Sequence, residues 1–153
     1  MKEQIREVNR VEMTFDNNPE NERIGRVMAS AFAAALNPTM EELSDFKTAV
    51  SEAVTNAIIH AYPAGRGDIL MIFERERDIV RVHIQDWGVG IADIRQSMEP
   101  LYTTWKSGER SGMGFTFMEA FTDRVEVKSE PGKGTTVSLT KKMGGVQWNR
   151  PVN

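Results

Sequence analysis

At 153 residues, 40% of them hydrophobic and 27% charged, the chain has the length and composition of one globular domain with a substantial core. Its formal net charge of −3, with lysines and arginines scattered along the sequence, gives no electrostatic reason to expect DNA or RNA as a direct partner. The absence of cysteine excludes a disulfide framework, a thiolate zinc site and a cysteine nucleophile.

The spacing of apolar residues predicts five strands and three helices. Because a residue before proline is kept out of the helical region, Asn37-Pro38 separates the first two helices. Thr39 followed by Glu42 is a capping-box pattern that opens the second helix. We expect strands over 11–15, 69–74, 79–85, 125–127 and 136–139, and helices over about 20–36, 39–60 and 114–121. Helices and a mainly antiparallel sheet in separate runs predict an α+β fold, a two-layer sandwich whose helices cover one face of the sheet.

The sequence shows neither a signal peptide at its start nor a stretch suited to crossing a membrane. The first ten residues lack the apolar centre of a signal peptide, and the longest apolar stretches are too short to span a bilayer. We therefore expect a soluble cytoplasmic protein. One domain over residues 1–143 should be followed by a disordered tail over residues 144–153.

The second expected helix carries a carboxylate and a carboxamide on one face. At roughly 100° per residue, Glu52 and Asn56 lie about 40° apart, opposite the apolar side of the helix. Taken alone, this pattern is that of an amphipathic helix with its polar face in water. In a second interpretation both side chains project into one cavity, where Asn56 holds Mg²⁺ and Glu52 deprotonates a hydroxyl or a water. A mid-helix asparagine favours the second interpretation, because asparagine is a poor helix former.

An aspartate and two glycines follow the strand expected at 79–85. Asp86, at the strand end, can accept a hydrogen bond from an exocyclic amine such as that of adenine. Gly88 and Gly90 would then let the backbone come close to a ligand. An aspartate-initiated tight turn accounts for the same residues equally well.

Two later glycine-containing stretches are weaker signals on their own. Gly112 and Gly114 stand at a helix start, where free N–H groups and the helix dipole bind phosphate oxygens, and Arg110 can reach a terminal phosphate. Thr135 follows Gly134 at the start of the last strand, where it either supports an adenine ring or is simply a good strand residue. Neither a Walker A loop nor a Rossmann fingerprint matches the sequence.

In series, these motifs resemble the GHKL, or Bergerat-fold, family of ATPases and kinases. The order is a helix with Glu and Asn, then Asp-x-Gly-x-Gly, then Gly-x-Gly at a helix start, then Gly-Thr, and the resemblance covers about Val11 to Lys142. The stretches NPTMEELSDFKTAVSEAVTNAIIHAY, PLYTT and ERSGMGFTFMEAF are similar to those of the anti-sigma F kinases of bacterial sporulation, with anti-sigma B kinases as the alternative. Trp87 departs from the pattern, since a small or acidic residue is expected there.

The resemblance implies a homodimer that binds ATP or ADP with Mg²⁺. In its ATP form it would hold a sigma factor of the sigma F type inactive, and it would phosphorylate a serine of an anti-anti-sigma protein. Glu52 becomes the catalytic base, Asn56 the Mg²⁺ ligand, Asp86 the adenine reader and Arg110 a lid residue near the γ-phosphate. Arg26 falls where the family contacts its protein partners. Other residues implied for the nucleotide pocket are Gly88, Gly90, Ile91, Thr104, Ser111, Gly112, Met113, Gly114 and Thr135, the last preferred to Thr136 because it directly follows Gly134.

Three other interpretations stay open from the sequence. The site can act as an ATP-dependent switch without chemistry, with ordering of the lid creating the partner surface. A histidine-kinase ATPase module would need a phospho-accepting histidine on a dimerisation helix, which neither His60 nor His83 provides. In a nucleotide-free interaction domain, every glycine would be only a turn.

Overall fold

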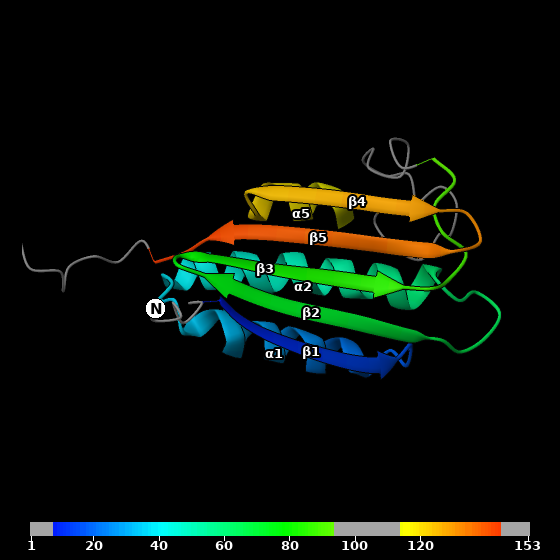
Figure 1. Ribbon diagram of the computed structural model, residues 1–153, viewed down its shortest axis with the longest axis horizontal. Helices are drawn as coiled ribbons and strands as arrows, with labels where there is room; N and C mark the ends of the chain where they lie inside the picture. Colours follow the sequence, from blue (N-terminus) through cyan, green and yellow to red (C-terminus); the bar gives the residue numbers. More distant parts are fainter. Residues whose placement is uncertain (1–7, 94–113, 145–153) are drawn as a thin grey trace, which may run out of the picture.

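Alternation of apolar and polar residues along five segments produces one antiparallel sheet. The computed structural model describes residues 8–93 and 114–144, and its strands lie side by side in the order β1-β2-β3-β5-β4 (Figure 1). Each neighbouring pair is antiparallel. The strands are β1 (Val8–Asp16), β2 (Asp68–Glu76), β3 (Ile79–Asp86), β4 (Arg124–Glu130) and β5 (Gly134–Lys142). Strand β5, the last in the described residues, thus lies inside the sheet, between β3 and β4.

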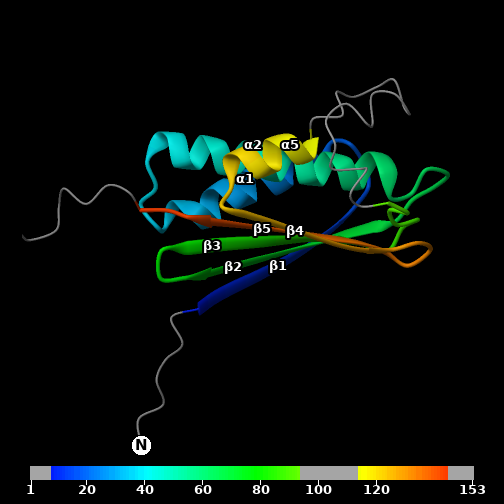
Figure 2. The same ribbon diagram turned by 90° about the horizontal axis from the view of Figure 1, so that it is seen from above.

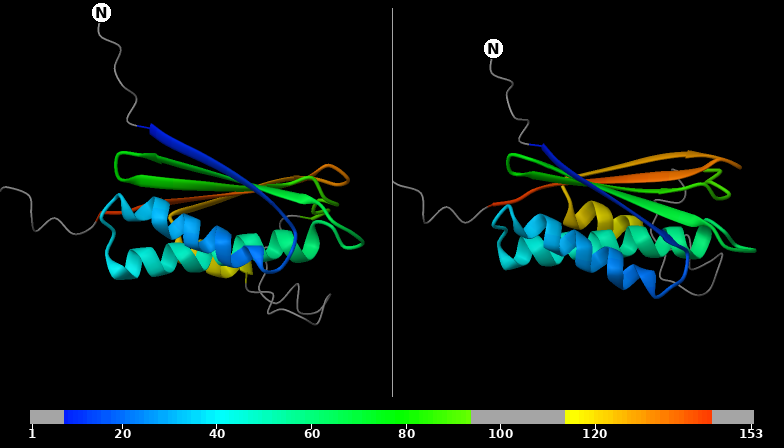
Figure 3. Two further views of the ribbon diagram at one scale, coloured as in Figure 1. Left: turned by 90° about the horizontal axis from the view of Figure 1, so that it is seen from below. Right: turned by 60° about the horizontal axis from the view of Figure 1, so that its bottom comes forward.

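The helices of the described residues all lie on one face of this sheet (Figures 2 and 3). They are α1 (Asn21–Ala34), α2 (Met40–His60) and α5 (Gly114–Phe121). Helix α2 packs between α1 and α5 and contacts both of them. None of these helices is long and apolar enough to cross a membrane.

The core lies between the helices and the sheet. Every second residue of β2 and β3 points to the helices and is buried, as the strand period of two requires. Small residues of α2 allow the helix to lie close to the strands. The buried positions are Ile69, Met71 and Phe73 of β2, Val80, Val82 and Ile84 of β3, Val137 and Leu139 of β5, and Ala49, Ala53 and Ala57 of α2. The intervening positions, which are mostly polar but include Leu70 and Ile72 of β2, face the other side of the sheet.

The α+β sandwich and the order of its elements confirm the sequence prediction, but the strands are longer than predicted. The pairing of β1 with β2 begins at Val8, opposite Glu76, because ladder hydrogen bonds extend the strands beyond the residues that alternate clearly. Helix α1 ends at Ala34, and Asn37 adopts φ 52°, which closes the helical hairpin before Pro38. The capping box predicted from Thr39 and Glu42 is present in both directions.

Thr39→Ala is expected to lower the free energy of unfolding by about 1 kcal/mol. The Thr39 hydroxyl accepts the backbone N–H of Glu42 at 3.0 Å, so alanine leaves a donor at the start of α2 without its cap. Thr48→Ala is the matched control on the same helix, since its hydroxyl only donates back to the carbonyl of Ser44. Urea denaturation measures both variants, and equal losses would contradict a capping effect.

Candidate functional site

Asp86 is the one buried charged or polar residue of the described segments, with 6% of its surface exposed. It ends β3 and shares the helix-facing side of the sheet with Ile84. Its Oδ1 accepts the backbone N–H of Gly88 at 2.9 Å and that of Thr135 at 3.2 Å. Burial raises the pKa of this carboxyl, and the two backbone N–H groups lower it in part. The carboxyl is therefore fixed in direction by the backbone of the following loop and by that of β5.

Both of these hydrogen bonds fall on Oδ1, and Oδ2 accepts none from the residues that the structure describes. A carboxylate oxygen that accepts no hydrogen bond within the described residues keeps its acceptor capacity, so Oδ2 is able to accept a ligand N–H. The sequence offered a tight turn and a ligand contact as alternatives for Asp86. The geometry contains the turn, through Gly88, and the ligand contact stays a prediction.

The loop after Asp86 is held between the end of α2 and the β4–β5 hairpin. Val89 donates its N–H to the Ala61 carbonyl at 2.9 Å, and its own carbonyl accepts the N–H of Gly132 at 2.8 Å. A Cβ on Gly88 would collide with the Ala61 carbonyl, and one on Gly90, where φ is +76°, with the Glu130 carbonyl. These glycines therefore let the loop approach protein backbone closely. Their predicted approach to a ligand stays a prediction.

Gly88→Ala is expected to lower the free energy of unfolding by about 3 kcal/mol. The added methyl group would meet backbone atoms of Ala61, which cannot rotate away as a side chain can. Gly65→Ala is the matched control, because a Cβ there meets no atom within 4 Å. Thermal unfolding followed by circular dichroism compares the two. A Gly88→Ala variant as stable as Gly65→Ala would show that the loop is not held against α2.

Two residues that the sequence analysis did not single out support this loop. The Tyr62 hydroxyl accepts the N–H of Trp87 at 2.9 Å and donates to the Asp68 carbonyl at 2.6 Å, and burial raises its pKa. The Ser129 hydroxyl accepts the N–H of Ile91 at 2.7 Å and bonds the hydroxyl of Thr135 at the same distance. A tyrosine in a loop otherwise made of small and polar residues was a usable signal for Tyr62. Nothing local marked Ser129.

Thr135 and Thr136 lie on opposite faces of the sheet. Thr135 pairs with Asp86 across the β3–β5 ladder and shares the side of the buried Val137, whereas Thr136 pairs with Gln85 on the other side. The position beside the buried carboxyl is thus that of Thr135.

Glu52 and Asn56 meet at the start of α5. A Cβ on Gly114, the first residue of that helix, would lie 2.9 Å from Asn56 Nδ2, 3.3 Å from Asn56 Oδ1 and 3.4 Å from Glu52 Oε2. Both side chains are half-buried and point toward the same helix end. The shared helix face that the sequence predicts is therefore present, and it faces α5.

This donor set suits a hard cation held jointly with a ligand. Carboxylate and carboxamide oxygens are the ligands that Mg²⁺ prefers, and Mg²⁺ usually takes one or two of them together with phosphate oxygens. Within residues 8–93 and 114–144 no group of three or more metal-binding side chains occurs. Asn56 would accordingly hold such an ion only with oxygens from a bound phosphate.

Several predicted site residues lie outside the described residues. They are Thr104, Arg110, Ser111, Gly112 and Met113, together with residues 145–153 of the predicted tail. Ile91 is described, and its half-buried side chain packs against the core beside the loop after Asp86.

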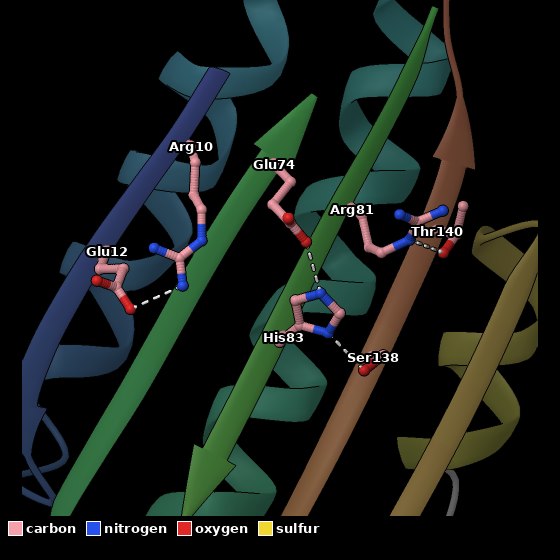
Figure 4. Close-up of polar contacts among 7 residues, drawn as sticks. All are labelled: Arg10, Glu12, Glu74, Arg81, His83, Ser138 and Thr140. Atoms are coloured by element: carbon pink, nitrogen blue, oxygen red, sulfur yellow. Dashed lines mark hydrogen bonds and ion pairs between the residues drawn. The ribbon is translucent and has the colours of Figure 1, made fainter. Parts of the chain in front are cut away.

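A second polar cluster lies on the open face of the sheet, away from this site (Figure 4). His83 of β3 bonds Glu74 of β2 through Nε2 at 2.8 Å and Ser138 of β5 through Nδ1 at 2.6 Å. The imidazole thus connects three neighbouring strands. His60 belongs to α2 on the other face of the sheet, so the two histidines do not form a pair.

Comparisons with known proteins agree in family and fold. The model of the histidine kinase-like ATPase domain matches residues 15–141. An anti-sigma F factor from Lysinibacillus sphaericus is 50% identical over 135 residues, which cover 88% of this chain and 92% of the relative. An anti-sigma F factor from Clostridium beijerinckii is 51% identical over 140 residues, which cover 90% of this chain and 97% of the relative.

Two solved structures share the fold at low identity. The RsbU and RsbW domains of Rv1364c from Mycobacterium tuberculosis match with a TM-score of 0.61 and 20% identity, over 88% of this chain and 32% of that one. The histidine kinase domain of the blue-light activated kinase from Erythrobacter litoralis EL346 matches with a TM-score of 0.53 and 18% identity, over 80% and 60%. This chain therefore spans about a third of the first of these proteins, and both matches bear on the fold alone.

Proposed function

Because this chain belongs to the anti-sigma F factor family and carries a histidine kinase-like ATPase domain, we propose that it is an ATP-dependent switch and serine kinase. With Mg²⁺–ATP bound, it holds a sigma factor of the sigma F type inactive. It also phosphorylates a serine of an anti-anti-sigma protein, which is its second partner. It acts as a homodimer.

The observation that carries this proposal is that α2 adjoins both halves of the site. Asn56 faces the start of α5, and Ala61, five residues later, accepts the N–H of Val89 in the loop after Asp86. Five residues of helix span only about 7 Å. The buried carboxyl and the oxygen donors of α2 are thus close enough to contact the two ends of one nucleotide.

Each residue has a chemical task in this proposal. Asp86 Oδ2 accepts the exocyclic amine of adenine, and Asn56 Oδ1 holds Mg²⁺. The bound Mg²⁺–ATP supplies a γ-phosphoryl group, whose transfer depends mainly on positioning and on stabilisation of charge. Glu52 accepts the proton of the incoming serine hydroxyl. Arg110, in the lid, is proposed from family resemblance to stabilise the charge on the phosphate.

The outer face of α1 is the proposed surface for protein partners. Ile24 and Val27 are 54% and 57% exposed, and they line a groove of about 550 Å³ with Arg23, Met28 and Ala31. Exposed apolar residues rimmed by arginine are typical of protein-binding sites. Arg26, on the α2 side of this face, would bind a carboxylate of the partner.

Two assays test the two activities separately. Incubation with γ-labelled Mg²⁺–ATP and the anti-anti-sigma protein of the same genome should transfer label to one serine, which mass spectrometry identifies. Capture of sigma F should be stronger with a non-hydrolysable ATP analogue than with ADP. Label transfer without nucleotide-dependent capture would support only the kinase activity and refute the switch. Capture without transfer would support only the switch and refute the kinase activity. Failure of both would refute the whole proposal.

A further inference from the structure

Glu22 accepts two hydrogen bonds on a single carboxylate oxygen. Its Oε1 lies 3.1 Å from Arg26 Nε, one helical turn along α1, and 2.6 Å from the hydroxyl of Ser51 on α2. The side chain of Glu22 is 21% exposed and that of Arg26 is 39% exposed. The carboxylate is thus the more enclosed partner of this ion pair.

Ser51 connects this carboxylate to the helix that carries the nucleotide site. It directly precedes Glu52, and one residue turns a helix by about 100°, so the two side chains leave α2 in different directions. Ser51 points to α1 and bonds Glu22, while Glu52 points to the start of α5. Successive residues of α2 therefore contact the partner-facing helix and the candidate catalytic region.

The hydrogen bond from Ser51 lowers the entropy cost of the ion pair between Glu22 and Arg26. A partly exposed pair at i and i+4 contributes little stability by itself, because water screens it and both side chains must be ordered. A carboxylate that a second helix already holds loses less freedom when it pairs with an arginine. The guanidinium of Arg26 is then restricted to fewer orientations before a partner binds, so less conformational entropy is lost on binding.

From this geometry we infer that Glu22 is a positioning residue for Arg26, fixed in place by Ser51. The orientation of the partner-binding arginine is thereby set by α2, the helix of Glu52 and Asn56. The inference rests on the proposed function, because it assigns partner binding to the α1 face. It adds the two residues that prepare this face, neither of which needs to touch the partner.

A double-mutant cycle on sigma F binding tests the inference, with Kd measured by calorimetry in the presence of a non-hydrolysable ATP analogue. Ser51→Ala should weaken binding by about three- to tenfold, the range expected from ordering one long side chain. In an Arg26→Ala background the same substitution should change Kd by less than about twofold, because the side chain that it positions is absent. Equal losses in both backgrounds, or no loss in either, would overturn the inference.

Two further variants separate positioning from folding. Ser51→Thr keeps the hydroxyl and should restore most of the affinity, while Ser51→Ala should unfold within a few degrees of wild type because alanine is a good helix former. Loss of affinity in Ser51→Thr as large as in Ser51→Ala would count against the hydrogen bond. If the wild-type protein does not bind sigma F, the proposed function itself is refuted. If Arg26→Ala binds sigma F with an unchanged Kd, Arg26 is not a partner-binding residue and the inference is refuted.

Discussion

Glu52→Gln is expected to lower the rate of serine phosphorylation by about 100- to 10,000-fold, the usual contribution of a general base. Glutamine has nearly the same size and keeps an oxygen close to Asn56 and the start of α5, but it cannot accept the proton of the serine hydroxyl. Nucleotide affinity should change by only a few-fold, because Asp86 and Asn56 are untouched. Single-turnover label transfer at saturating Mg²⁺–ATP measures this effect directly.

Glu41→Gln provides the control for this variant. Glu41 is an exposed glutamate in the first turn of the same helix, about four turns before Asn56 and the start of α5. It should phosphorylate at the wild-type rate. If Glu52→Gln retains a rate within a few-fold of Glu41→Gln, proton transfer to Glu52 is not part of the mechanism.

Asp86→Asn is expected to abolish most nucleotide binding while the protein remains folded. The asparagine oxygen can accept both N–H groups that now bond Oδ1, from Gly88 and Thr135. Its NH₂ group then occupies the position of Oδ2, where a donor would face the amine of adenine. Losing a charge-assisted hydrogen bond and leaving two donors opposed should weaken ADP binding by a factor on the order of 100. Calorimetry with Mg²⁺–ADP measures this loss.

The same variant should be at least as stable as wild type at neutral pH. Burial raises the pKa of Asp86 above its ordinary value of 3.8, so the folded state holds its proton more tightly than the unfolded state. Wild-type stability is therefore lost as the pH rises from 3.8 through the raised pKa, whereas asparagine does not titrate. The free energy of unfolding of Asp86→Asn, relative to that of wild type, should increase over this pH range and stay constant above it.

Asp78→Asn, in the turn at the opposite end of the sheet, controls for the loss of one negative charge. It should bind Mg²⁺–ADP as wild type does, and its free energy of unfolding relative to wild type should not increase over this pH range. Weak ADP binding in both variants would point to net charge, and an Asp86→Asn variant that binds as tightly as wild type would refute the adenine contact.

The sequence predicted most reliably those features that depend on neighbours within one turn of helix. The capping box of Thr39 and Glu42, the common face of Glu52 and Asn56, and the start of α5 at Gly114 are all local patterns. Local spacing fixes them because a helix repeats every 3.6 residues. Features that need no tertiary information were therefore the ones that the sequence predicted correctly.

Features that join distant segments were not predictable from local pattern. The bond from Thr135 to Asp86 spans 49 residues, and it exists only because β5 lies between β3 and β4. No spacing rule gives that strand order, so the support from Ser129 was not visible in the sequence. The close approach of Gly88 to the end of α2 and of Gly90 to the β4–β5 hairpin likewise appears only in three dimensions.

The central claim is that one Mg²⁺–nucleotide is bound between the end of β3, α2 and the start of α5. Addition of Mn²⁺–ADP in place of Mg²⁺–ADP, followed by NMR of the ¹⁵N-labelled protein, locates the ion by the signals that it broadens. The account predicts strong broadening of the Asn56 side-chain amide and of the Gly114 backbone amide, and little change at Arg81 and Thr140 on the open face of the sheet (Figure 4). Broadening centred on the open face, or no change with millimolar nucleotide, would contradict it.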